Sequence, residues 1–566
     1  MAFFSRTRVA TLGVAALILG CGHLAFEEIP NSEAPGVDAG DERPPVEVID
    51  AAGGTDASMV DAGCVGPSCP GTYVSGTTGS DTNPGTGAAP VKTIGQAMKI
   101  AVALGGSQKV YVAAAHYPEK ITLVEKVDLL GGYECKATPC TWTRDIAMND
   151  TVINNTDYEG VLALKTITRQ TLFEGLQVVG RPGAPDAGLG SVGVTLNGGS
   201  PTIRRCRIAG ADTTGGIPNA KRSIGVELIA PSNSTEGALL DRNSISAGSA
   251  TNDSIGILFD NRPAAPPLSV AVATVTNNTI RGGAAPFTSG VVAWNSGAAT
   301  LLRGNDITGG TSGGGSANDS SWGIAVDSAM TIDANRINVD QVNAGSCQQN
   351  TMSFCGGIRS GGSTTFITNN VVFGAKAPRS AAVLLTESEQ AAGVVVLNSN
   401  TLDGSGNAAF TGSMSTAIAL RIGFGTNTII GSIRNNILLG GVNKDRFGIY
   451  EETTPGKTGH PSAIDNNDFY NPPPARNDFV YRRYNGMAPV DVPFGQLGTV
   501  TNPVPSGNIN DDPRLDAKYH LSTGSGSGPA SPCIDKGTTL EAPPRDMDGD
   551  SRPKGVASDI GADEAK

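Results

Sequence analysis

Histidine, the side chain most often used for proton transfer and metal binding near neutral pH, is scarce in this chain. The 566 residues contain four histidines, His23, His116, His460 and His520. Because these positions are far apart in the sequence, a Ser-His-Asp triad or a histidine metal site is disfavoured.

One acidic segment, Asp546-Met547-Asp548-Gly549-Asp550, could bind calcium. An EF-hand loop would need Gly at its sixth position and Glu at its twelfth, where this chain has Ser551 and Ala557. The sequence therefore favours a turn in which the carboxylates meet Arg545 and Arg552. Calcium is the one cofactor that the sequence suggests, and no other metal site is expected.

Eight of the nine cysteines lie beyond residue 60 and invite disulfide chemistry. Three close pairs are candidates for local disulfides, namely Cys64–Cys69, Cys135–Cys140 and Cys347–Cys355. Oxidation of these cysteines to disulfides is plausible in an exported protein. A disulfide that closes so short a loop fixes the local chain but adds little to the stability of the whole fold. Cys206 and Cys533 remain and are expected to be buried.

The elements that must position these residues follow from a repeat. A phrase of the form aliphatic-x-x-Asn-x-apolar returns every 27 to 37 residues. In two earlier copies the Asn position holds Leu176 and Cys206. The later copies place asparagine there, at Asn243, Asn278, Asn305, Asn335, Asn370, Asn400, Asn436 and Asn467. A repeat of this length indicates a solenoid or a propeller.

The repeat is built from strands. β-Branched and aliphatic residues flank the Asn, Gly follows soon after, and a second alternating phrase, such as 254–259, recurs between the first ones. A propeller blade needs roughly 40 or more residues and tight hairpins. The sequence therefore predicts an all-β fold, a right-handed parallel β-helix of about ten or more coils. Stacked coils would place the asparagines about 4.8 Å apart, as a structural ladder that satisfies buried backbone groups.

The two ends of a solenoid need caps. Thr93 can cap a helix that Gly105-Gly106 ends. The apolar face of this helix would contain Ile94, Ala97, Met98, Ala101 and Leu104. The expected division of the chain is a signal peptide (1–21), a disordered acidic linker (22–75), an N-terminal cap with the first coils (76–150), β-helix repeats (151–475) and C-terminal coils with a capping segment (476–566).

The N-terminal segment is typical of an export signal. Arg6 and Arg8 precede an apolar stretch, Val9–Gly20, that is too short to span a bilayer. The segment Leu17-Ile18-Leu19-Gly20-Cys21 resembles a bacterial lipobox, which implies that Cys21 carries a lipid and anchors the protein at the outer membrane or cell surface. An ordinary secretory signal cleaved elsewhere is the alternative.

The acidity of the chain is concentrated in the linker. Residues 22–62 contain ten acids against Arg43, so they carry −9 of the formal net charge of −12. The folded part has no basic stripe, and a nucleic-acid partner is therefore not expected. A monomer is expected.

Both ends of the folded part resemble known modules. The N-terminal matches are 81–86, Pro90, 92–94, Ala97, Tyr117-Pro118-Glu119 and Gly131-Gly132-Tyr133. They resemble an uncharacterised module that opens many exported bacterial β-helix proteins of the pectin-lyase-like superfamily, although His116 replaces the usual Gly. The C-terminal matches are Tyr519-His520-Leu521, 531–537, 546–549, Arg552-Pro553 and 559–562, which resemble a common ending of such proteins. The resemblance implies fold and export; the superfamily mixes lyases, hydrolases and non-catalytic proteins.

Hydrolases of the polygalacturonase type carry four short sequence motifs that can be compared with this chain. Asn155-Thr156-Asp157 matches one of them. The only Asp pair, Asp511-Asp512, lies past the repeats. Gly459-His460-Pro461 and Arg421-Ile422-Gly423 each depart from the required pattern. One short match does not indicate a hydrolase.

Lyases of this fold combine a calcium-holding acidic cluster with an Arg or Lys base. The repeats contain Asp260, Arg262, Asp327, Asp333 and Arg336, but no spacing gathers them on one coil face. A solvated outer face is the simpler interpretation.

No catalytic residue is assigned from the sequence. The sequence favours a cell-surface lipoprotein that binds glycans or surface components without catalysis, with a lyase or hydrolase of acidic polysaccharide as the alternative. The segment 481–484, Tyr-Arg-Arg-Tyr, could stack on a sugar, although an exposed strand explains it equally well. Function is expected where the repeat is interrupted, at 181–190, 211–222 and 340–356.

Overall fold

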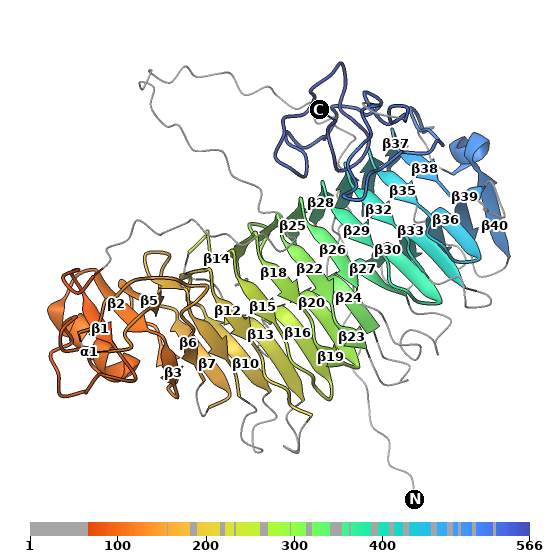
Figure 1. Cartoon of the computed structure of the whole chain (residues 1–566). Helices are drawn as coiled ribbons and strands as arrows, with labels where there is room; N and C mark the ends of the chain where they lie inside the picture. Colours follow the sequence, from red (N-terminus) through yellow and green to blue (C-terminus); the bar gives the residue numbers. More distant parts are fainter. Residues whose placement is uncertain are drawn as a thin grey trace, which may run out of the picture. The chain divides into compact units, whose positions relative to one another are not determined.

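Each repeat folds into one coil of three short strands, and each strand pairs in parallel with its counterpart in the next coil (Figure 1). The strands form three long sheets, here called A, B and C. The predicted fold class, a right-handed parallel β-helix, is confirmed. The computed structural model describes residues 66–565, except for 138, 155–156, 182–189, 215–220, 231, 233, 261–269, 295, 313–319, 340–353, 362–363, 387–393, 407–412, 423–428, 454–460, 472–478, 485–487, 501–504 and 525–527.

Sheet A contains β1 (Thr72–Val74), β2 (Gln108–Ala113), β5 (Val127–Tyr133), β8 (Leu172–Glu174), β11 (Thr202–Arg204), β14 (Ala238–Asp241), β17 (Ala273–Thr276), β21 (Leu301–Arg303), β25 (Met330–Asp333), β28 (Thr365–Thr368), β31 (Val394–Asn398), β34 (Ile429–Arg434) and β37 (Ala463–Asp465). Sheet B contains β3 (Ala115–Tyr117), β6 (Thr151–Ile153), β9 (Gln177–Val179), β12 (Arg207–Ala209), β15 (Ser244–Ser246), β18 (Thr279–Arg281), β22 (Asp306–Gly309), β26 (Arg336–Val339), β29 (Val371–Phe373), β32 (Thr401–Asp403), β35 (Ile437–Leu439) and β38 (Asp468–Tyr470). Sheet C contains β4 (Ile121–Thr122), β7 (Glu159–Leu164), β10 (Ser191–Asn197), β13 (Arg222–Ala230), β16 (Asp253–Phe259), β20 (Phe287–Ala293), β24 (Ser320–Val326), β27 (Cys355–Gly361), β30 (Arg379–Thr386), β33 (Met414–Ile422), β36 (Asp445–Thr453), β39 (Phe479–Tyr484) and the antiparallel β40 (Pro489–Pro493). Two further strands, β19 (Ala284–Ala285) and β23 (Thr311–Ser312), pair with each other.

The core runs through the inside of the coils as stacked aliphatic columns. In sheet A, Ile203 pairs with Leu240, Leu240 with Val275 and Val275 with Leu302, and all four are fully buried. Alternation along each strand sends every second side chain to the outside. The thin aliphatic core explains how a chain poor in aromatic residues can fold.

A two-residue turn joins sheet A to sheet B in most coils, and asparagine suits both of its positions. The first residue has a positive φ, as at Asn277 (56°) and Asn369 (55°), a conformation that Asn tolerates better than most residues. The second residue points inward. Asn335 donates from Nδ2 to Leu302 O (2.9 Å) and to Asn370 Oδ1 (3.1 Å).

The same inward hydrogen bonds repeat from coil to coil and form a continuous amide ladder. The eight members are Asn243, Asn278, Asn305, Asn335, Asn370, Asn400, Asn436 and Asn467. At one end Cys206 N donates to Asn243 Oδ1 (2.9 Å), and at the other Asn467 donates to Asn508 Oδ1 (3.1 Å). Asn508 is thus a ninth member that the repeat did not reveal.

Helix α1 (Ile94–Leu104) covers the first coils, as the capping prediction requires. Thr93 accepts a hydrogen bond from Gln96 N at Oγ1 (3.2 Å). The carboxylate of Glu119 accepts from Ile94 N and from Gly95 N, each at 2.9 Å. One prediction was wrong: Leu104 is 64% exposed, because the last residue of the helix extends past the core.

The N-terminal motif residues are therefore structural. Asp81 accepts hydrogen bonds from Lys92 N and Thr93 N, and Asn83 donates to Pro90 O. Residues 66–75, which the linker was predicted to include, contain β1 and belong to the fold.

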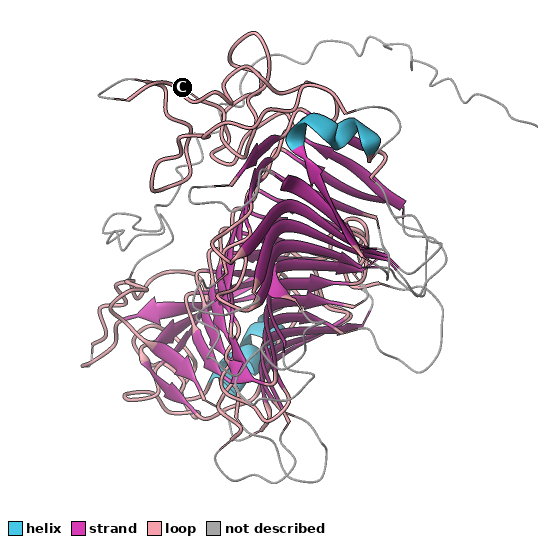
Figure 2. Cartoon of the chain, turned by 90° about the vertical axis from the view of Figure 1, so that its right-hand side faces the viewer, coloured by secondary structure: helices cyan, strands magenta, loops and turns pink. Residues whose placement is uncertain are grey.

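The C-terminal end is closed in two ways. The 3₁₀ helix η2 (Phe494–Thr499) packs against β39 and β40, and Leu497 belongs to the internal core. Figures 1 and 2 show the two helices near opposite ends of the stack of strands. The described residues of 505–565, here called the strap, then run back beside sheets A and B (Figure 1, dark blue).

Candidate functional site

The outer side of sheet C carries a second apolar cluster, separate from the internal core. In β16, Ile257 and Phe259 belong to the core, whereas Ile255 and Leu258 belong to this second cluster. We call the cluster the apolar face. Its buried members are Val192, Ile224, Ile255, Leu258, Val292, Trp322, Ala325, Phe354, Ala381, Leu384, Met414, Ala419, Phe447 and Tyr450. Phe287, Trp294, Phe479 and Tyr484 pack against them and are partly buried.

This face differs from the outside of sheet A, where from β8 to β37 the last residue of each strand is polar. There Asp333 pairs with Arg303 (2.6 Å) and Arg434 with Asp465 (3.4 Å). An outward sheet surface that only meets water is expected to be polar. Most members of the apolar face are buried, so the part of it that a ligand could contact is formed by its partly exposed aromatic residues, Phe287, Trp294, Phe479 and Tyr484.

Two arginines lie over aromatic rings of the apolar face. Arg379 lies 4.4 Å from the ring centre of Phe354 and 5.7 Å from that of Tyr450. Arg482 lies 4.3 Å from the ring centre of Phe447. Burial raises the pKa of the Tyr450 phenol above its ordinary value. Cation–π contacts of this kind combine a flat apolar surface with hydrogen-bond donors.

Strands β13 and β16 carry a charged group beside their members of the apolar face. The Arg222 guanidinium faces three carboxylates, Glu227 at 3.6 Å and Asp253 and Asp260 at 3.4 Å each. These side chains are between 12% and 29% exposed. This group was not found from the sequence, because Arg222 and Asp253 belong to successive coils and only the parallel register places them side by side.

Of the five charged residues considered for a lyase, the four that the structure describes are not brought together. Asp260 lies with Arg222, while Asp327 lies 3.6 Å from Arg359. Asp333 is on sheet A, and Arg336 is on sheet B over the ring of Phe373. Arg262 lies outside the described residues.

The hydrolase elements are also dispersed. Asp157 forms an ion pair with Lys120 (3.1 Å), and Asn155 and Thr156 lie outside the described residues. Asp511 and Asp512 belong to the strap, near Asp468. Gly459 and His460 lie outside the described residues as well.

The two histidines that the structure describes lie in different parts of the fold. His116 is exposed on β3, whereas His520 lies in the strap, and His23 lies outside the described range. His520, Asp548 and Asp563 place one ligand atom each within 4.8 Å of one another, the one such group in the described part of the chain. His520 Nε2 is 3.0 Å from Asp548 Oδ2.

The acidic segment 546–550 forms a turn. Asp546 Oδ1 accepts from Asp548 N (3.0 Å) and from Asp550 N (2.7 Å). Asp550 pairs with Lys554 (2.8 Å), and Arg545 donates to Gly549 O. The turn is therefore held by backbone hydrogen bonds, while Arg552 pairs with Glu564 (3.0 Å).

Among the cysteines, Cys135 and Cys140 form a disulfide. Cys69 and Cys355 are disulfide-bonded too, while Cys64 and Cys347 lie outside the described residues. Cys206 and Cys533 are buried free thiols. Burial raises the pKa of Cys206 to about 12, so it is neutral at pH 7 and unsuited to act as a nucleophile.

In the segment 481–484, Tyr481 and Arg482 bind other residues of the chain. Tyr481 is buried, and its OH donates to Glu451 (2.6 Å). Arg482 makes a two-pronged contact with Asp491, at 2.5 and 2.8 Å. Of the three interruptions of the repeat, 182–189, 215–220 and 340–353 lie outside the described residues.

Comparisons with known proteins add the following. No protein-family model matches the chain, and no curated protein matches it. One solved structure that matches is titled "The complex structure of XylC with xylose". It has 13% sequence identity and a TM-score of 0.37, and the alignment covers 87% of this chain and 98% of that chain. Within the described range, no helix has the length and apolar character needed to cross a membrane.

Proposed function

We propose that this protein is a lipid-anchored, non-catalytic β-helix that binds a glycan on the outer side of sheet C. The apolar face is the observation that supports the proposal. Sugar rings present apolar C–H faces that pack on aromatic side chains, and arginines beside those rings can bind hydroxyl or carboxylate groups. Repetition at about 4.8 Å per coil suits an extended chain more than a compact ligand.

Phe287 and Trp294 are the best placed aromatic residues for such a contact. Both lie at β20 in the middle of the stack, and both are partly exposed, whereas Trp322 of the next coil is 3% exposed. A chain running along the solenoid axis would cross this coil.

The test is retention of the purified, lipid-free protein on immobilised polysaccharides, followed by titration with the best ligand. Trp294→Ala should weaken binding about tenfold, which corresponds to about 1.4 kcal/mol. Phe366→Ala is the matched control, because Phe366 is 45% exposed but lies on the outside of sheet A. Equal losses for both variants, or no retained polysaccharide, would refute the proposal.

A polysaccharide lyase or hydrolase is the second candidate, and the group around Arg222 favours it. Three carboxylates from two successive coils could hold a cation beside the acid group of a polysaccharide. The same incubation separates the two functions: an enzyme releases shortened products, unsaturated for a lyase, and Arg222→Ala would abolish their release. A binding protein is retained without product.

A further inference from the structure

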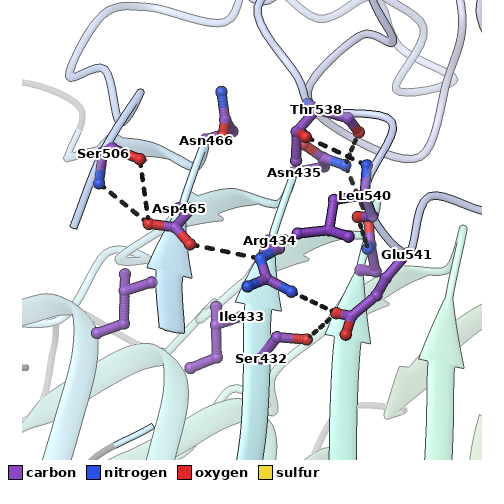
Figure 3. A network of polar contacts seen from close by, with 12 residues as sticks. Ser432, Ile433, Arg434, Asn435, Asp465, Asn466, Ser506, Thr538, Leu540 and Glu541 are labelled. Atoms are coloured by element: carbon purple, nitrogen blue, oxygen red, sulfur yellow. Dashed lines mark hydrogen bonds and ion pairs between the residues drawn. The ribbon is translucent and has the colours of Figure 1, made fainter. Parts of the chain in front are cut away.

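The strap is held along several coils by the outward asparagines of the A-to-B turns. Asn466 Nδ2 donates to Lys536 O (2.9 Å) and Asn369 Nδ2 donates to Arg545 O (2.8 Å). Between them, Asn435 donates to Thr538 O (2.8 Å) and accepts from Thr538 N (2.7 Å), as Figure 3 shows. These asparagines have φ between 53° and 55° and precede the inward ladder residues.

Charged contacts reinforce the docking. Arg434 of β34 forms an ion pair with Glu541 of the strap (2.6 Å), and Ser432 Oγ donates to the same carboxylate (2.5 Å), as Figure 3 shows. Arg434 also contacts Asp465 (3.4 Å). These contacts lie at the edge of the interface, where Glu541 is 45% exposed.

A carboxyl group lies under the strap. Asp468 of β38 is fully buried. Its Oδ1 accepts from Asp511 N (3.2 Å) and its Oδ2 accepts from Cys533 Sγ (3.3 Å). The titratable groups around it are Cys533, Asp511 and Asp512 of the strap and Tyr470 of its own strand, and none of these is a cation.

We propose that the strap docks reversibly on the solenoid and that the protonation of Asp468 controls the docking. Burial raises the pKa of Asp468 to about 7, and the charges of Asp511 and Asp512 add to the rise. When the strap leaves, water reaches the carboxyl group, and its pKa returns to roughly 3.9, the value of a free Asp. Docking therefore takes up a proton near neutral pH.

The direction of the pH dependence follows from this uptake. Because the docked pKa is raised, the contribution of Asp468 to docking is complete below the free pKa and is fully lost once pH has risen through about 7. Between roughly pH 3.9 and pH 7 the docking constant should fall about tenfold per pH unit, since docking takes up one proton there, and above pH 7 it should no longer change. The strap is then held most tightly in acidic surroundings and least tightly from neutral pH upward.

Hydrogen exchange of the full chain between pH 4.5 and 9, corrected for intrinsic rates, tests the proposal. Strap peptides should lose protection from pH 4.5 to pH 7 and show no further change above pH 7, whereas peptides from β20 and β24 should keep their protection throughout. Asp468→Asn, which resembles the protonated form, should remove the pH dependence. Asp559→Asn is the matched control, because Asp559 is a strap carboxyl whose own pKa burial raises to about 6.

Asn435→Ala keeps the test decisive if Asp468→Asn does not fold. It removes two docking hydrogen bonds, so the strap should exchange faster at every pH while the slope below pH 7 persists. Strap protection that is unchanged from pH 4.5 to 7 in the wild type, or a slope that persists in a folded Asp468→Asn protein, would overturn the proposal.

Discussion

Asparagine has two distinct tasks at adjacent positions of one turn. The inward Asn satisfies backbone groups and the next Asn, while the outward Asn adopts a positive φ and, in the last coils, holds the strap. The ladder could be predicted because its members recur at regular spacing with apolar neighbours. The outward column could not, because Arg242 and Ala334 occupy it in other coils and its partners come from a distant segment.

Removing the side-chain amide of one ladder asparagine should clearly lower the free energy of unfolding. Asn335→Ala deprives Leu302 O of its donor and Asn305 N of its acceptor, both buried. An unsatisfied buried polar group costs about 1–3 kcal/mol, so the free energy of unfolding should fall by about 3 kcal/mol. Urea unfolding measures the change. Cys206→Ala, which removes only a weak S–H donor in the same column, should cost markedly less, and equal costs would contradict the ladder's role.

A helix or strand could be predicted where the residues that specify it lie within one short segment of the sequence. The N-terminal helix has a cap residue, an apolar stripe and a glycine end within one short segment, and only the exposure of Leu104 was missed. The apolar face, in contrast, needs the register between strands of successive coils. Trp322 pairs with Ser289, and this pairing has no signal in either segment alone.

The N-terminal cap should depend on one carboxylate. Glu119 accepts two N–H groups at the positive end of α1, and an anion there is worth about 0.3–1 kcal/mol beyond its hydrogen bonds. Glu119→Gln should therefore increase hydrogen exchange in residues 94–104 and destabilise the cap by about 1 kcal/mol. Lys99→Gln, an exposed change in the same helix, is the control. Equal exchange in the two variants would contradict the capping role.

At the scale of the whole molecule, the route of the strap could not be predicted. Its contacts join residues far apart, such as Cys533 with Asp468 and Asn369 with Arg545, which are 65 and 176 residues apart. The sequence predicted a C-terminal capping segment from the motifs that begin at Tyr519. Those motifs do not indicate that the chain turns back beside earlier coils instead of ending the stack.

The position of the molecule in the cell depends on its N-terminal segment, which ends at Cys21, and one variant tests it. A lipid on Cys21 would anchor the protein, because each buried CH₂ contributes about 0.8 kcal/mol and more than one acyl chain gives stable binding. The full-length protein, expressed in a bacterium, should then partition into the detergent phase of a cloud-point extraction. Cys21→Ala should shift it to the aqueous phase, while Cys206→Ala should not. A Cys21→Ala protein that stays with the detergent would indicate another anchor, and a wild-type protein in the aqueous phase would indicate the ordinary secretory signal. Either outcome would refute the lipoprotein proposal without affecting the glycan test, which uses the lipid-free chain.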